Sequence, residues 1–213
     1  MRIIAGFHRG RQIDAPEGLS TRPMTDRVRE NLFNLIGPSV ADAVVLDLFS
    51  GSGALGMESL SRGAASATFV DTDRQAIEVV ETNCRRLGLL DRARILRRDV
   101  LRPGPWIRPV GVAHYTLLFV DPPYKMTADP AGQAALAGMA AELVRLDCVA
   151  PEAEVMIRAE RGVALPLPWD GFVRTDERSY GSTTLHFMMY RGPGAGGAPA
   201  ADDGGAPAPE GAP

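Results

Sequence analysis

The stretch AVVLDLFSGSGALG, residues 43–56, reads as a buried strand that runs into a glycine-rich turn and then a helix. Gly51, Gly53 and Gly56 stand in G-x-G-x-x-G spacing, in which glycine permits a tight turn and a close approach of backbone to a ligand. The pattern alone fits a dinucleotide, another nucleoside ligand, or a turn that binds nothing. It indicates where a nucleoside would lie without deciding which one.

Strand-like and helix-like patterns alternate from this stretch onward. Apolar runs predict strands at residues 43–49, 67–71, 93–99 and 115–121, and helices are predicted at 54–61, 74–87 and near 130–147. This order favours an α/β fold with a parallel sheet covered by helices on both faces. Strands at 153–160, 172–180 and 183–190 follow, and the last two are consistent with an antiparallel hairpin at the sheet edge.

The two ends of the chain differ from this alternating body. Residues 1–15 predict a hairpin of two short strands, and Thr25 and Asp26 can begin a helix that stops at Gly37. We therefore expect one domain over residues 1–191, with residues 1–37 as an N-terminal hairpin and helix. Residues 192–213 are dominated by Gly, Ala and Pro, and we expect them to be disordered.

Length and composition narrow the classes of protein. With 213 residues, of which 45% are hydrophobic, the chain can bury one full-sized core. No apolar stretch approaches the roughly 20 residues that a membrane span requires, so a soluble, cytoplasmic protein is expected, and we expect it to be a monomer. Its 3 histidines and 2 cysteines show no metal-ligand spacing, so no metal is expected.

The formal net charge of −3 hides an uneven distribution. Residues 192–213 carry 3 of the 26 acidic groups and no basic group, which leaves 23 basic and 23 acidic groups in the body. Eight arginines fall between residues 85 and 108, against only Asp91 and Asp99. This local excess suits contacts with phosphate, although an ordinary solvated face would look the same.

Carboxylates near the glycine loop discriminate between its possible ligands. Asp47 ends the first strand four residues before Gly51, and Asp71 closes the next strand, where an acid can bind the hydroxyls of a ribose. A pyrophosphate beside Asp47 would be repelled by a few kcal/mol at about 4 Å, whereas a cation would be attracted. S-adenosylmethionine, an adenosine with a sulfonium and an ammonium group, is therefore favoured over a nicotinamide cofactor. Asp99 can accept from the adenine amino group, or it can simply cap a turn.

FVDPPY, residues 119–124, follows the apolar strand at 115–121. Two prolines fix φ and remove two backbone donors, so the carbonyls after the strand are expected to remain available as acceptors instead of entering a turn. Asp121 and the Pro122 carbonyl can hold the two protons of a nucleobase amine and aim its nitrogen at a methyl group. Tyr124 offers a flat face on which an unstacked base can lie. A plain proline-rich turn is the alternative for an isolated DPP.

The chain resembles the RsmD-type methyltransferases, which modify the N2 amine of a guanine in bacterial 16S ribosomal RNA. The resemblance spans nearly everything except residues 192–213. It rests on RIIAG, STRPMTDRVRENLFNLI, VLDLFSGSGALGMESLSRGA, FVDPPY and SYGSTTLHF. It implies a class I, Rossmann-like methyltransferase sheet of seven strands with an antiparallel last strand. It also implies S-adenosylmethionine as methyl donor and the small ribosomal subunit, or an intermediate in its assembly, as substrate.

The resemblance also implies roles for individual residues. The cofactor-binding set is Asp47, Phe49, Gly51, Gly53, Gly56, Asp71 and Asp99, and the catalytic set is Asp121, Pro122, Pro123 and Tyr124. Two positions depart from the family pattern, because members often carry Asn where this chain has Asp121 and an acid where it has Ser182. A DPPY form also occurs in adenine-N6 DNA methyltransferases, which leaves the identity of the base open.

Several arginines are candidates for contact with RNA. Arg22 and Arg27 lie in a polar segment that precedes the first helix and that we expect to cover the site, although a network of Arg and Asp that pins the hairpin to the domain is equally consistent. Arg9 in the hairpin, and Arg97 and Arg98 in the arginine-rich stretch, complete the predicted set.

Two other functions fit the sequence. A DNA base amino-methyltransferase would use the same chemistry, but the chain has no second domain or long insertion with which to read a duplex. A non-catalytic RNA-binding module for ribosome assembly would need neither DPPY nor an intact glycine loop.

Overall fold

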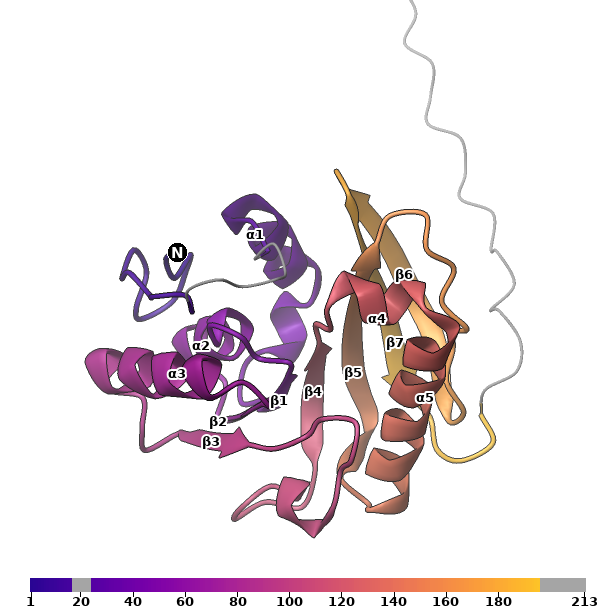
Figure 1. Ribbon diagram of the computed structural model, residues 1–213. Helices are drawn as coiled ribbons and strands as arrows, with labels where there is room; N and C mark the ends of the chain where they lie inside the picture. Colours follow the sequence, from indigo (N-terminus) through magenta and orange to yellow (C-terminus); the bar gives the residue numbers. More distant parts are fainter. Residues whose placement is uncertain (17–23, 196–213) are drawn as a thin grey trace, which may run out of the picture.

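The computed structural model describes residues 1–16 and 24–195, and Figure 1 shows the arrangement of the elements. The helices are α1 (Asp26–Leu35), α2 (Ala54–Ser61), α3 (Arg74–Leu87), α4 (Tyr124–Ala128) and α5 (Pro130–Arg145), with short 3₁₀ turns η1 (Gly37–Ser39) and η2 (Pro105–Ile107). The strands are β1 (Val44–Leu48), β2 (Ser66–Asp71), β3 (Ala93–Arg97), β4 (Tyr115–Val120), β5 (Val149–Glu160), β6 (Phe172–Tyr180) and β7 (Thr183–Tyr190).

Within the described residues these strands form one seven-stranded sheet in the order β3-β2-β1-β4-β5-β7-β6. The first five are parallel, whereas β7 runs antiparallel to both β5 and β6. The order reverses between β1 and β4, and parallel sheets bind ligands beyond the carboxyl ends of the strands at such a point. The glycine loop follows β1 and the DPPY motif follows β4, so the topology brings these two motifs together.

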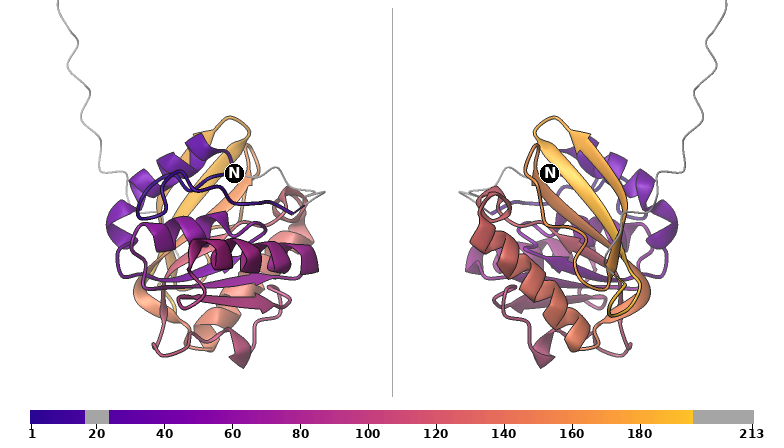
Figure 2. Two further views of the ribbon diagram at one scale, coloured as in Figure 1. Left: turned by 90° about the vertical axis from the view of Figure 1, so that its left-hand side faces the viewer. Right: turned by 90° about the vertical axis from the view of Figure 1, so that its right-hand side faces the viewer.

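Helices cover both faces of the sheet, with α1, α2 and α3 on one side and α5 on the other (Figures 1 and 2). Side chains alternate along β1, so that Val45 joins the core under α2 while Leu46 and Leu48 join the core under α5. Asp47 has the same parity as Val45. This alternation directs an acidic side chain toward the start of α2, in an otherwise apolar strand.

The N-terminal hairpin is less regular than the sequence predicts. The two arms pair antiparallel around Arg2 and Gln12, with backbone hydrogen bonds from Ile3 to Arg11 and from Ile13 to Met1, but the paired stretch is too short to form a strand. The reason lies in the backbone donors of the first arm, because the N–H groups of Ile4 and Ala5 bond to the Glu58 carboxylate at 2.7 and 3.0 Å. A side chain of α2 has replaced the partner strand as acceptor.

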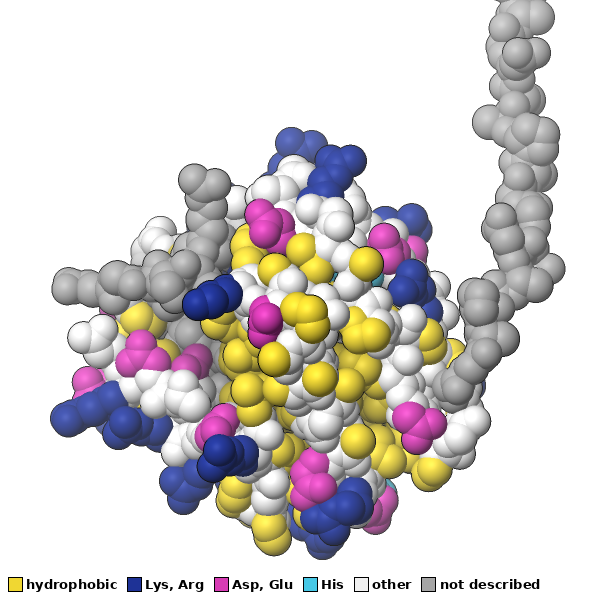
Figure 3. Space-filling view, turned by 45° about the vertical axis from the view of Figure 1, so that its right-hand side comes forward, with side chains coloured by type: hydrophobic (Ala, Val, Ile, Leu, Met, Phe, Trp, Pro, Cys, Tyr) yellow, Lys and Arg dark blue, Asp and Glu magenta, His cyan; other side chains and the backbone are white. Residues whose placement is uncertain are grey.

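The region after β4 contains a short helix, α4, that the sequence pattern does not reveal. It is separated from α5 by Asp129, whose side chain caps α5 by accepting from the N–H of Gly132 at 3.0 Å. α5 ends two residues earlier than predicted, because Asp147 adopts a left-handed backbone with φ of 53°. Figure 3 shows hydrophobic side chains over the centre of the α5 side of the molecule, with charged groups mostly toward its margin. None of the described helices combines the length and the apolarity that a membrane span needs.

Candidate active site

Three adjoining pockets lie beyond the carboxyl ends of β1, β2 and β4. The glycine-loop pocket has about 340 Å³, the central pocket about 50 Å³ and the tyrosine pocket about 680 Å³. Asp121 lines the first two pockets and Arg158 lines the last two, so neighbouring pockets along this track share a wall. Their principal side chains are Phe49, Asp71, Asp99 and Met126 in the first, Asp47 and Arg29 in the second, and Arg27, Tyr124 and Thr183 in the third.

The glycine loop is built by unusual backbone conformations and one close approach. Gly53 precedes α2 with φ of 75°, and Phe49 adopts φ of 59°, a conformation that costs a residue other than glycine on the order of 1–3 kcal/mol. A Cβ on Gly56 would lie 2.3 Å from the ring of Phe69 in β2. The third glycine therefore lets α2 pack directly against the sheet.

Asp71 uses both carboxylate oxygens as acceptors for backbone N–H groups, and one of these groups belongs to the glycine loop. One oxygen accepts from the N–H of Gly51 at 2.9 Å, and the other accepts from the N–H of Asp73 at 2.9 Å. Each carboxylate oxygen has capacity for a further hydrogen bond. Asp71 can thus hold the loop in place and still bind the hydroxyls of a ligand in the glycine-loop pocket.

Asp47 is buried, with 1% of its surface exposed, and its carboxyl accepts a hydrogen bond of 2.9 Å from the N–H of Gly56. Burial raises the pKa of Asp47 well above its usual range, and the nearby Asp121 and Asp71 raise it further, while the Gly56 hydrogen bond opposes the shift. A cation beside it would favour the charged form. The sequence predicts the location of Asp47 but not its bond to the helix.

Asp99 caps a turn, as the alternative interpretation of the sequence holds. Its Oδ1 accepts from the N–H of Leu101 at 3.0 Å, and its Oδ2 lies 3.6 Å from Nε of Arg102. Asp99 nevertheless lines the glycine-loop pocket opposite Asp71. Asp99 can therefore cap the turn and also contact a ligand in the pocket.

The DPPY motif begins α4, and this corrects the expectation that its carbonyls stay outside a turn. The carbonyl of Pro123 accepts from the N–H of Met126 at 2.8 Å, so that carbonyl is used by the helix. Pro122 is buried between Asp121 and the helix start. The Tyr124 hydroxyl lies 2.5 Å from the hydroxyl of Thr183 in β7, which fixes the far end of the ring.

Arg158 in β5 is a residue of the site that the sequence analysis does not single out. Only 4% of its side chain is exposed, and its Nε lies 2.5 Å from Oδ1 of Asp121. Burial raises the pKa of Asp121, while the charge and the hydrogen bond of Arg158 lower it. An arginine in the middle of the apolar run VMIRAE is the signal that would have revealed it, because such a residue is rarely buried without an acidic partner.

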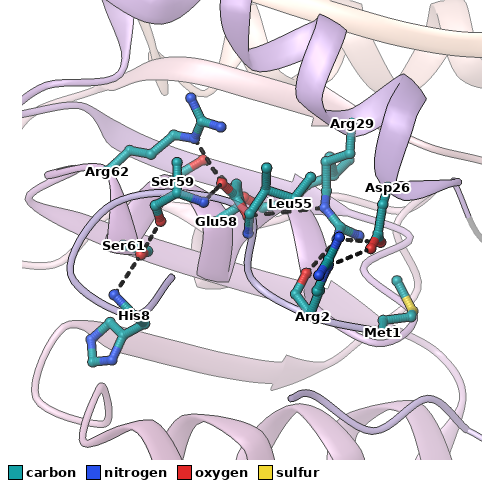
Figure 4. A network of polar contacts seen from close by, with 12 residues as sticks. Met1, Arg2, His8, Asp26, Arg29, Leu55, Glu58, Ser59, Ser61 and Arg62 are labelled. Atoms are coloured by element: carbon teal, nitrogen blue, oxygen red, sulfur yellow. Dashed lines mark hydrogen bonds and ion pairs between the residues drawn. The ribbon is translucent and has the colours of Figure 1, made fainter. Parts of the chain in front are cut away.

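A second buried arginine borders the central pocket. Arg29 of α1 is 0% exposed and donates to the carbonyl of Arg2 at 2.5 Å and to Asp26 at 3.0 Å. Its Nε lies 4.0 Å from Glu58, which is also completely buried and binds Arg62 at 2.7 Å. Figure 4 shows this network, which joins the N-terminal segment and α1 to α2. It contains the Arg and Asp contacts that the sequence offers as an alternative role for the polar segment.

The predicted RNA-contacting arginines are spread over the surface. Arg27 is exposed and lines the tyrosine pocket, whereas Arg9 lies in the exposed N-terminal hairpin turn. Arg97 and Arg98 lie at the end of β3, an edge of the sheet, and both side chains bond to backbone carbonyls. Arg22 falls outside the described residues. Among the described members of this set, only Arg27 lies at the same pocket as Tyr124.

Groups of three or more His, Cys, Asp or Glu side chains that could hold a metal ion are absent from the described part of the chain. Both cysteines, Cys84 and Cys148, are buried free thiols, and burial raises the pKa of Cys84 to about 12. Neither thiol is near the reactive form at neutral pH.

Comparison with known proteins identifies the family. The family described as "Conserved hypothetical protein 95" matches residues 1–189. The Bacillus subtilis protein named "Putative rRNA methyltransferase YlbH" is 36% identical over 90% of this chain and 100% of its own length. The "Ribosomal RNA small subunit methyltransferase D" of Escherichia coli K12 is 42% identical over 59% of this chain and 61% of its own length.

A solved structure shares the fold. It is described as "Putative methyltransferase yhhF from Escherichia coli", is 30% identical, covers 90% of this chain and 98% of its own, and superposes with a TM-score of 0.73. The expected class I, Rossmann-like methyltransferase sheet of seven strands with an antiparallel last strand is therefore confirmed. The chain belongs to the family described as conserved hypothetical protein 95, and its resemblance to the RsmD-type methyltransferases is confirmed.

Proposed function

We propose that the protein transfers a methyl group from S-adenosylmethionine to the N2 amine of a guanine in 16S ribosomal RNA of the small subunit. The observation that carries this proposal is the position of Asp121. This acid lines both the pocket rich in carboxylates and the central pocket, and the central pocket shares its partner Arg158 with the pocket lined by Tyr124. The names of the relatives, which are ribosomal RNA methyltransferases, support RNA as the substrate class.

The chemistry of the glycine-loop pocket supports the methyl donor. Four acids, Asp71, Asp73, Asp99 and Asp121, are among its described lining residues, and none of those residues is Lys or Arg. A pyrophosphate would find like charges and no cationic partner there. An adenosine with a sulfonium and an ammonium group fits this donor set. Asp71 and Asp99 would hold its nucleoside end, and Asp47 would face its cationic end.

The track of pockets supports a direct transfer. Bound there, S-adenosylmethionine would supply an electrophilic methyl carbon. Asp121 and the carbonyl of Pro122 would accept hydrogen bonds from the two N–H groups of the target amine. These bonds would keep the lone pair of the amine nitrogen directed at that carbon. Asp121 would stabilise the positive charge that develops on the amine nitrogen as this nitrogen takes up the methyl group, until one proton leaves to water.

The tyrosine pocket supports an extruded base as the acceptor. Its volume of about 680 Å³ is open to solvent beside Arg27, whose charge suits an RNA phosphate. A base that has left its stack can lie against Tyr124, a contact worth about 1–3 kcal/mol. We place this activity in the cytoplasm, on the small subunit or on an intermediate in its assembly.

The proposal is tested by treating undermethylated small subunits and duplex DNA in parallel with enzyme and labelled S-adenosylmethionine. We expect label in 16S RNA only, in a guanine carrying one additional methyl on N2 when its nucleosides are mapped by mass spectrometry. Asp121→Ala should remove this signal. Methylation of adenine in DNA would select the DNA alternative. Binding of RNA without methylation by the wild-type protein would select the assembly module.

A further inference from the structure

Arg158 is a buried cation that lies next to two residues of the DPPY motif, Asp121 and Tyr124. Its neighbours on β5, Ile157 and Ala159, are also buried, and its own side chain is 4% exposed. Val120 pairs with Ile157 in the sheet, so Asp121 and Arg158 follow side by side on adjacent strands. Taking a guanidinium out of water requires compensating contacts, and the described contacts are with the candidate active site.

The guanidinium contacts both ends of the motif at once. Its Nε lies 2.5 Å from the Asp121 carboxylate, and its central carbon lies 5.2 Å from the centre of the Tyr124 ring. A cation at this distance from an aromatic face is attracted to it. The hydroxyl at the other end of the ring is held by Thr183 at 2.5 Å. The tyrosine ring is thus fixed at one face and at its tip.

We propose that Arg158 is a positioning residue that fixes the Asp121 carboxylate relative to the Tyr124 ring and leaves one face of that ring for the target base. This inference rests on the proposed function. The planar guanidinium of Arg158 contacts both the Asp121 carboxylate, which would bind the target amine, and the Tyr124 ring, on which the target base would lie. The distance between them is therefore set before RNA binds. Because Arg158 covers one ring face, the base stacks on the opposite face.

Arg158 also sets the charge of the acceptor. The charged side chains that share pockets with Asp121 or contact it are Arg158 from β5, Arg29 from α1, Asp47 from β1, Asp71 at the end of β2, and Asp73 and Asp99 from the loops after β2 and β3. Burial raises the pKa of Asp121 and Arg158 lowers it. Without Arg158 the carboxylate would share these pockets with four other acids. It would then hold its proton to a higher pH.

The test compares Arg158→Met and Arg158→Lys with a control, Arg191→Met, which removes an exposed ion pair with Glu152. Single-turnover methylation of small subunits is measured across pH, alongside the affinity for S-adenosylmethionine. We expect Arg158→Met to lower the rate at neutral pH about 100-fold, as misplacement of reacting groups by about 1 Å does. The acidic limb of its pH profile should move to higher pH. Arg158→Lys should restore the acidic limb of the pH profile to its wild-type position. Its KM for RNA should still be higher than that of the wild type, because lysine lacks the planar group.

A double variant addresses folding, since Arg158→Met alone leaves Asp121 as a buried acid without its cation. Asp121→Asn with Arg158→Met removes both charges and should unfold at the wild-type temperature, yet methylate at least about 100-fold more slowly than wild type. A wild-type rate and pH profile in folded Arg158→Met would overturn the positioning role while leaving the proposed function intact. If the wild-type protein itself methylates no RNA, the proposed function fails first.

Discussion

Asp47 accepts a hydrogen bond from the backbone N–H of Gly56, which lies nine residues further along the chain, at a distance of 2.9 Å. The bond joins the end of β1 to the first turn of α2 and holds the glycine loop between them. It also uses an acid in an almost fully buried position, where water cannot stabilise its charge. A carboxylate at position 47 is therefore better suited to the protein with a cationic ligand bound beside it than to the protein without one.

The first prediction concerns Asp47→Asn, in which the amide oxygen can still accept from Gly56. Because the pKa of Asp47 is raised on folding, its contribution to stability is present below the unfolded value of 3.8 and is lost as pH rises through the folded value. Between about pH 5 and pH 8, wild-type Tm should fall relative to that of the variant. The variant should bind S-adenosylmethionine about tenfold more weakly, since a charge-assisted hydrogen bond is worth about 1.5–3 kcal/mol. Calorimetry measures both, with the exposed Asp91→Asn as control.

Gly56→Ala should destabilise the protein. The added methyl would lie 2.3 Å from the Phe69 ring, so α2 must move outward and weaken the bond to Asp47. We expect a loss of about 1–3 kcal/mol in the free energy of unfolding. Gly138→Ala in α5 meets no heavy atom within 4 Å and should instead stabilise by about 0.5–1 kcal/mol. Chemical denaturation compares the two, and equal effects would show that α2 does not pack as closely as described.

Tyr124 variants separate the ring from its hydroxyl. Tyr124→Ala removes the stacking face and should lower kcat/KM for RNA by the equivalent of about 1–3 kcal/mol. Tyr124→Phe loses only the contact with Thr183 and should lower it by about 1 kcal/mol. Both variants should keep the wild-type affinity for S-adenosylmethionine, because the ring lines the tyrosine pocket. An unchanged kcat/KM in Tyr124→Ala would remove the ring from the mechanism.

Glu58→Gln tests the network under the N-terminal hairpin. The carboxylate accepts from Ile4 and Ala5 and faces the buried Arg29, so its neutralisation breaks a buried charge network and leaves Asp26 as the described acid beside that cation. We expect a loss of about 3–5 kcal/mol in the free energy of unfolding, with faster hydrogen exchange at the two amides. Glu81→Gln removes an exposed pair with Arg85 and should change stability by less than about 1 kcal/mol. Similar losses in both variants would contradict the buried role of Glu58.

Local patterns in the sequence determined most of the elements, because hydrophobic periodicity and glycine spacing are properties of neighbouring residues. The helices at 54–61 and 74–87 and the strands at 172–180 and 183–190 have the predicted bounds. The positions of the acids near the glycine loop were also predictable, since each lies at or just beyond the carboxyl end of a parallel strand and such strands end at one edge.

Tertiary structure alone decided which side chains meet across elements. Glu58 replaces a strand partner for the N-terminal arm, and Arg158 reaches both Asp121 and Tyr124 from a neighbouring strand. Such contacts depend on register and on the compensation of buried charge, and neither can be read from residues that lie 34 or more positions apart in the chain. The sequence thus determined where the predicted site residues stand in the fold, and packing decided how they are held.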